Sequence, residues 1–238
     1  MRVSRTVTGS ARRGVVLLAA AVLLLVPAPA HAAGTPTQDP PPQPFTVDGG
    51  NWSGYVMTGT GFRSVSARWT QPVVTCTPGS TAFAPWVGLD GYGSGTVQQT
   101  GVATDCSGGT PVSRAWYEVA PEPAVYYELP VQGGDEIAAE VVRSGDSYTM
   151  TIRNLTRGWS RSAVRTHPGA NVSAEVALEA QQGGFPEFGS VRFTGATVDG
   201  KPMSTPSATA IDATDAKGFL TSTGGLSGGG FTIRHLRE

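Results

Sequence analysis

The chain of 238 residues carries 17 Lys and Arg against 18 Asp and Glu, and it contains 32 glycines, 18 prolines and two cysteines. This length allows one sizeable hydrophobic core or two small ones. The nearly balanced charge forms no basic stripe, so we expect no nucleic-acid partner.

Residues 1–32 have the pattern of a secretory signal peptide. Four arginines precede an apolar run from Val15 to Val26, and Ala30-His31-Ala32 supplies small residues around a cleavage point. A membrane anchor would need roughly 18 or more apolar residues, and this run is shorter. We therefore expect a secreted, extracellular mature chain that carries 13 basic and 18 acidic side chains and has no membrane attachment after cleavage.

The next segment, residues 33–48, is rich in Pro, Thr and Gln and has almost no large apolar side chain. Such a composition is typical of an extended linker or a short pro-segment. Residues 49–238 show no internal repeat, and we expect them to form a single domain in a monomeric protein.

Strand signals dominate this predicted domain. Apolar and polar side chains alternate in residues 65–69, 148–152 and 191–193, and turn residues at 133–135 and 144–146 separate such runs. Glycine and proline interrupt nearly every window long enough for a helix. Many short strands with frequent turns predict an all-β fold, either an antiparallel β-sandwich or a barrel.

The two cysteines, Cys76 and Cys106, are expected to form a disulfide. In an exported protein a lone pair more often forms a disulfide than a metal site, since a structural zinc usually needs four Cys or His ligands. The disulfide would close a loop of about 30 residues and add roughly 3–4 kcal/mol to the free energy of unfolding. We expect no metal and no cofactor.

The chain lacks the residues that several common hydrolase mechanisms require. A Ser-His-Asp triad needs a histidine base, and only His167 and His235 follow the predicted signal peptide. Neither comes with a G-x-S-x-G motif, and the sequence contains no H-E-x-x-H motif and no phosphate-binding loop. Carboxylate and amide side chains remain as the candidate catalytic groups.

Polar residues of these kinds lie inside otherwise apolar strand segments, at residues 86–91, 97–101, 115–118 and 174–179. In the last segment the two-residue period of a strand puts Glu175 and Glu179 on one face, about 13 Å apart, which is too far to share one proton. Because Glu prefers the surface, such a face can also be merely solvated.

Five short blocks stand in order along the chain: Asn51-Trp52-Ser53-Gly54-Tyr55, Trp86-Val87-Gly88-Leu89-Asp90-Gly91, Gln99-Thr100-Gly101, Trp116-Tyr117-Glu118, and Ala174-Glu175 with Glu179. In order and spacing they resemble the glutamic peptidases, also called eqolisins. The resemblance implies a sandwich of two large, curved antiparallel sheets, similar to the concanavalin or lectin jelly roll, with a cleft on the concave face. It also implies an acid endopeptidase that acts on polypeptides.

The same resemblance implies that Gln99 and Glu179 are the catalytic residues and that the acidic residues Asp90 and Glu118 line the cleft. The neighbouring Gln98 would point to the opposite face of the sheet. The three tryptophans Trp52, Trp86 and Trp116 are further candidates for substrate binding. Trp52 and Trp86 also suit a hydrophobic core, whereas Trp116 shares its face with Glu118.

A Glu and a Gln suit peptide hydrolysis. A carboxylate can accept a proton from water and then return it to the leaving nitrogen, if its pKa lies near the working pH. An amide can orient the water through its oxygen and stabilise an oxyanion through its N–H. A free Glu titrates at about 4.3, so we expect activity at acidic pH.

Two other classes of protein fit parts of the sequence. A glycoside hydrolase could use Glu118 and Glu179 as paired carboxylates, and it would need Glu118 more than Gln99. A carbohydrate-binding module on the same sandwich would instead present its aromatic residues as an exposed platform.

Overall fold

The computed structural model describes residues 47–78, 81–181 and 184–237. The predicted signal peptide and nearly all of the predicted linker lie outside these ranges, although the last two linker residues form the short strand β1 (Val47–Asp48). Within the described ranges the chain forms strands, bridges and turns and contains no helix. This confirms the all-β prediction and follows from the alternating residues and the frequent turn residues.

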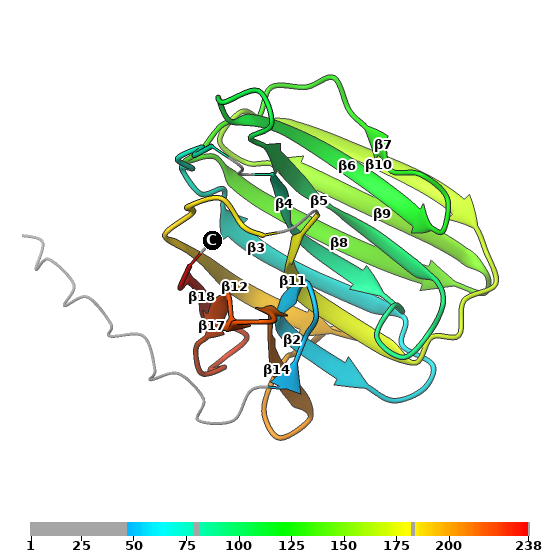
Figure 1. Cartoon of the computed structure of the whole chain (residues 1–238). Helices are drawn as coiled ribbons and strands as arrows, with labels where there is room; N and C mark the ends of the chain where they lie inside the picture. Colours follow the sequence, from blue (N-terminus) through cyan, green and yellow to red (C-terminus); the bar gives the residue numbers. More distant parts are fainter. Residues whose placement is uncertain (1–46, 79–80, 182–183, 238) are drawn as a thin grey trace, which may run out of the picture. The chain divides into compact units, whose positions relative to one another are not determined.

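The first sheet holds the segments that carry the candidate site residues (Figure 1). All of its neighbouring strands are antiparallel except β1 and β14, which are parallel. In spatial order, the strands are β1, β14 (Ala208–Asp212), β2 (Trp52–Thr58), β11 (Ser173–Ala180), β4 (Ala82–Leu89), β5 (Val97–Asp105), β6 (Val112–Ala120) and β7 (Val125–Tyr126).

The second sheet packs against the inner face of the first. In spatial order, its strands are β10 (Trp159–Thr166), β9 (Ser147–Asn154), β8 (Glu136–Ser144), β3 (Ser64–Thr70), β12 (Ser190–Val198), β18 (Phe231–His235) and β17 (Thr221–Thr223). The short β13 (Lys201–Pro202) pairs with β12, and β15 (Thr214–Asp215) pairs with β16 (Gly218–Phe219).

The two sheets enclose one main hydrophobic core, so the fold is a sandwich rather than a barrel. Large apolar side chains from both sheets fill it, including Tyr55 and Val87 from the first sheet and Trp69, Ile152 and Phe193 from the second. These residues occupy the inward positions that the two-residue period predicts. The outer faces of both sheets remain for solvent and for function.

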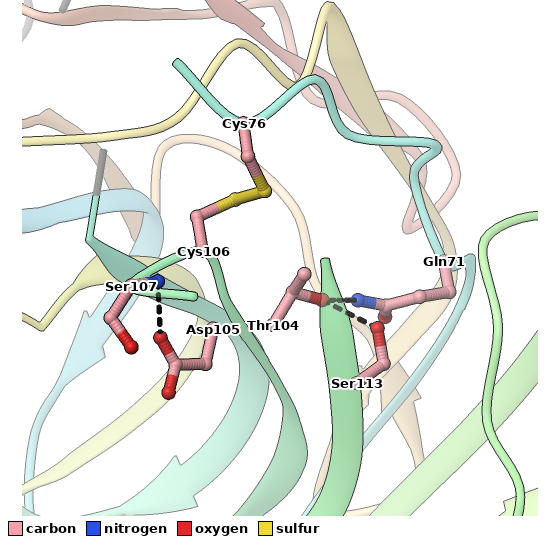
Figure 2. Close-up of a disulfide and its surroundings, with 7 residues drawn as sticks. All are labelled: Gln71, Cys76, Thr104, Asp105, Cys106, Ser107 and Ser113. Atoms are coloured by element: carbon pink, nitrogen blue, oxygen red, sulfur yellow. Dashed lines mark hydrogen bonds between the residues drawn. A yellow bond between two sulfur atoms is a disulfide. The ribbon is translucent and has the colours of Figure 1, made fainter. Parts of the chain in front are cut away.

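A hydrogen-bonded chain joins the two sheets near the disulfide, and Figure 2 shows its part from Gln71 to Ser113. The Trp69 indole donates to Gln71 Oε1 at 3.0 Å, and Gln71 Nε2 donates to the Thr104 hydroxyl at 3.0 Å. Thr104 in turn lies 2.8 Å from the Ser113 hydroxyl. Gln71 is fully buried, and these bonds satisfy both ends of its amide.

Cys76 and Cys106 form the predicted disulfide, which links the segment after β3 to the end of β5. The two cysteines are 30 positions apart in the chain. The bond therefore connects the second sheet to the strand that carries Gln99.

Replacing both Cys76 and Cys106 by Ser should lower the free energy of unfolding by about 3 kcal/mol, because the unfolded chain regains the entropy of an open loop of this length. Urea denaturation followed by circular dichroism measures the change. Far-ultraviolet spectra should match those of the parent chain at low urea. Equal unfolding midpoints for the two proteins would contradict the stabilising role of the disulfide.

Candidate active site

The outer face of the first sheet carries most of the residues selected from the sequence. Along β4, β5, β6 and β11 the side chains alternate between the core and this face. The register places Gln99 of β5 opposite both Glu118 of β6 and Gly88 of β4. Gly88 in turn lies opposite Glu175 of β11, and Glu179 lies four residues further along that strand.

The Gln99 amide is held from one side by Glu118. Its Nε2 donates a hydrogen bond of 2.6 Å to Glu118 Oε2, while its Oε1 is buried and has no partner among the described residues. The neighbouring Gln98 lies opposite Leu89 and Val119, which belong to the main core. The alternation thus separates the two glutamines as predicted, with Gln99 on the outer face.

Glu179 is partly exposed on the same face. Asn51 Nδ2 donates to Glu179 Oε1 at 2.9 Å. Burial raises the pKa of Glu179, hydrogen bonds from Trp52 and Asn51 lower it in part, and the charge of Glu118 raises it further. The two carboxyls are therefore close enough for the charge of one to affect the protonation of the other.

Three tryptophans form the floor between these polar groups. Trp52 packs edge-on against Trp86, with ring centroids 4.9 Å apart, and both belong with Trp116 to a second, smaller apolar cluster. A Cβ added at Gly88 would lie 2.7 Å from the Trp86 ring and 3.1 Å from Gln99 Cβ. The Trp86 indole therefore covers Gly88 beside Gln99, and the glycine is needed to make room for it.

The floor offers unused hydrogen-bonding groups. The indole N–H groups of Trp86 and Trp116 are buried without a partner among the described residues, and so is Gln99 Oε1. Leaving a buried polar group unpaired costs roughly 1–3 kcal/mol, so such groups usually mark a place where water or a ligand binds. Two donors and one acceptor that lack partners within the described ranges therefore lie beneath the outer face around Gln99.

Asp90 differs from the cleft-lining position that the resemblance implied. It is fully buried, and its two carboxylate oxygens accept hydrogen bonds from the backbone N–H groups of Asn171 and Val172, at 2.9 and 2.8 Å. β4 ends at Leu89, and Asp90 takes a left-handed backbone conformation with φ of 67°, which turns its side chain towards these amides. In this position Asp90 anchors the segment before β11.

Glu175 is a buried carboxyl that the sequence analysis did not select. It is fully buried on the face of Gln99, and neither oxygen forms a well-aligned hydrogen bond within the described ranges. Burial raises the pKa of Glu175 well above its usual value, the nearby Ser173 and the Tyr92 backbone lower it only in part, and the charge of Asp90 raises it further. Strand alternation predicts which face of the sheet Glu175 occupies, but only the structure shows that the loop residue Tyr92 lies beside it.

A hollow of about 200 Å³ adjoins the face beyond Glu179. Small residues form part of its lining, with Ala82 and Ala103 beside Arg114, Asp105 and Tyr126. The Arg114 guanidinium lies 5.6 Å from the centre of the Tyr126 ring. The hollow could receive a side chain of an extended ligand lying across the strands.

The described parts of the chain contain no group of side chains arranged to bind a metal ion. Within them, no three His, Cys, Asp or Glu side chains come together in the manner of metal ligands.

A family model and a known protein each match most of this chain. Residues 50–235 match the model of the Peptidase A4 family. The chain is 30% identical over 221 residues to Aspergillopepsin-2 of Aspergillus niger, an alignment that covers 78% of this chain and 77% of that protein.

Solved structures share the fold. Scytalido-glutamic peptidase, crystallised with a peptide-based transition state analog, superimposes with a TM-score of 0.70 at 26% identity, covering 80% of this chain and 100% of that one. SCP-B, an eqolisin in a complex with the tripeptide Ala-Ile-His, gives a TM-score of 0.66 at 25% identity with the same coverage. These likenesses confirm the two-sheet sandwich.

Glu175 should make the fold more stable in acid than at neutral pH. A raised pKa means that the folded chain holds the proton more tightly than the unfolded chain. The stabilisation is therefore complete below the unfolded pKa of about 4.3 and is lost as the pH rises through the folded value. Thermal unfolding between about pH 4 and pH 7 should show the melting temperature of the parent chain falling, and Glu175→Gln should flatten that fall.

Glu122→Gln is the matched control, because Glu122 is exposed in the turn after β6. If the melting temperatures of Glu175→Gln and Glu122→Gln decline equally with pH, Glu175 is not the group responsible.

Proposed function

Because the chain belongs to the peptidase A4 family, the glutamic peptidases, and is an acid endopeptidase, we propose that Gln99 and Glu179 together activate the water that cleaves the peptide bond. The family membership that the sequence blocks indicated is confirmed. A glycoside hydrolase and a carbohydrate-binding module are not favoured by these relatives.

One observation carries the assignment of the pair. Gln99 presents a buried amide oxygen without a partner, on the same face as a carboxyl whose pKa burial has raised. An acceptor that can orient water and a base with a pKa near an acidic working range are the two groups that hydrolysis requires.

The geometry sets one condition on this proposal. Glu179 and Gln99 are two strands and four residues apart, so a flat sheet would place their Cα atoms about 16 Å from each other. Two long side chains can meet across that interval only if the sheet curls towards its outer face. The electrostatic coupling of Glu179 to Glu118, the hydrogen-bonded partner of Gln99, supports such an approach.

The steps follow from the chemistry of the two groups. Ionised Glu179 accepts a proton from the water, whose oxygen is oriented by Gln99 and attacks the carbonyl carbon. The second N–H of the Gln99 amide stabilises the oxyanion of the tetrahedral intermediate. Protonated Glu179 then gives its proton to the leaving nitrogen, the C–N bond breaks, and the carboxylate is restored.

The substrates are polypeptides bound in an extended form across the outer face. The partly exposed Trp52 and Glu118 contact the substrate near the scissile bond, the buried Trp86 and Trp116 support them from below, and the hollow beside Arg114 receives a side chain further along the substrate. The protein acts outside the cell as a monomer, with no nucleic-acid or membrane partner. In the described ranges no helix is long and apolar enough to cross a membrane.

Gln99→Ala and Glu179→Gln should each abolish the digestion of denatured protein at about pH 5, where more of the Glu179 base is ionised than at the usual Glu pKa of about 4.3. Loss of one oxyanion donor alone costs about 2.7–4 kcal/mol, which lowers kcat about 10²- to 10³-fold. Loss of the base should lower it at least as far. The assay measures peptide release by mass spectrometry, with pepstatin present.

Both variants must keep the far-ultraviolet spectrum of the parent chain. A folded Gln99→Ala or Glu179→Gln protein that digests substrate at more than a tenth of the parent rate would remove that residue from the mechanism.

The fall of kcat/KM at low pH reports the protonation of the catalytic base, Glu179. Because Glu179 must be ionised to accept a proton, kcat/KM should fall as the pH drops through its pKa, and burial places that pKa above the usual value for Glu. A profile of kcat/KM from about pH 2 to pH 6, spanning the usual Glu pKa, measures this limb. A limb that lies below the pKa of a free Glu would contradict the assignment.

A further inference from the structure

Among the residues that the structure describes, Glu118 alone forms a hydrogen bond with the Gln99 side chain. The two residues are direct partners in the pairing of β5 with β6, and Gln99 Nε2 lies 2.6 Å from Glu118 Oε2. Glu118 is partly exposed, whereas Gln99 is 4% exposed. The carboxyl therefore stands at the solvent side of a buried amide.

This bond selects one of the two orientations of the amide. A glutamine amide can rotate by half a turn, which exchanges its oxygen and its NH2 group. An ionised carboxylate only accepts hydrogen bonds, so it requires the NH2 group of Gln99 on its side. The oxygen then points away from Glu118, and one N–H of the NH2 group stays free for a substrate.

Glu118 also acts on Glu179 through space. Its charge raises the pKa of Glu179 on β11 and that of Tyr126 on β7. On its own strand Arg114 occupies the same face, and on β5 the facing group is the Gln99 amide. Of these groups, Gln99 and Glu179 are the proposed catalytic pair.

We propose that Glu118 is a positioning residue that fixes the orientation of the Gln99 amide and adjusts the protonation of Glu179. This inference rests on the proposed function of the pair. It assigns Glu118 a role in the reaction rather than a contact that only binds substrate.

The role depends on pH in a defined direction. Burial raises the pKa of Glu118, and the hydrogen bond from Gln99 lowers it in part. While Glu118 is ionised, its oxygens can only accept, and one amide orientation is held. Once protonated, Glu118 can also donate its O–H to Gln99 Oε1, which allows the rotated amide and occupies the oxygen that orients the water.

The test compares Glu118→Gln with Glu118→Asp on a peptide substrate. Glu118→Gln keeps the size but removes the charge, so both amide orientations become possible. We expect kcat to fall about 10- to 100-fold, as for the loss of a hydrogen bond to a charged group, with KM within about threefold of the parent value. The acid limb of its kcat/KM profile should move to lower pH, because the charge that raises the pKa of Glu179 is gone.

Glu118→Asp keeps the charge but withdraws it from Gln99 by one methylene group. This variant should have a lower kcat, while the acid limb of its kcat/KM profile stays at the parent position. If Glu118→Gln does not fold, Glu118→Asp still tests whether the contact with Gln99 matters. Glu122→Gln, which removes an exposed carboxyl near the end of the same strand, should match the parent chain in kcat, KM and profile.

The outcomes separate this inference from the proposed function. An inactive but folded parent chain would overturn the peptidase mechanism itself. An active parent chain with Glu118→Gln indistinguishable from Glu122→Gln would overturn only the role of Glu118. So would a lower kcat in Glu118→Gln with the acid limb unmoved, since that result fits a merely structural residue.

Discussion

The antiparallel register between β4, β5 and β6 is the constraint on which the candidate site depends. It sets Gln99 against Glu118 on one side and against Gly88 on the other. Because side chains alternate along a strand, a slip by one residue would bring Gln98 to the outer face and bury Gln99 in the core. The inward-facing Val102 of β5 opposes such a slip, since it would leave the main core for the outer face.

The outer face of the first sheet combines two properties. It buries aromatic rings as a core does, yet it holds carboxyl and amide groups among them. Removing carboxyls from water favours their neutral form, so the pKa values of Glu118, Glu175 and Glu179 are all raised. A face built in this way binds protons more readily than a solvated one, and its chemistry suits an acidic medium.

Strand alternation predicted the all-β fold class and the cysteine count predicted the disulfide, because both are local signals. The common cleft of Gln99, Glu118 and Glu179 was implied by the resemblance of the sequence blocks to the glutamic peptidases and not by alternation. The sequence did not predict the place of Asp90, whose left-handed backbone turns the carboxylate onto distant amides. Nor did it predict the burial of Glu175, since that depends on the loop residue Tyr92. Both misses concern contacts between segments far apart in the chain, which strand periodicity does not encode.

The most direct measurement is a crystal structure of the protein bound to a peptide that carries a tetrahedral transition-state mimic. If Gln99 and Glu179 act on the same water, one oxygen of the mimic will lie within hydrogen-bonding distance, about 2.6–3.2 Å, of both the Gln99 amide and the Glu179 carboxyl. A mimic that binds elsewhere on the molecule, or that reaches Glu179 while Gln99 stays beyond contact, would contradict it.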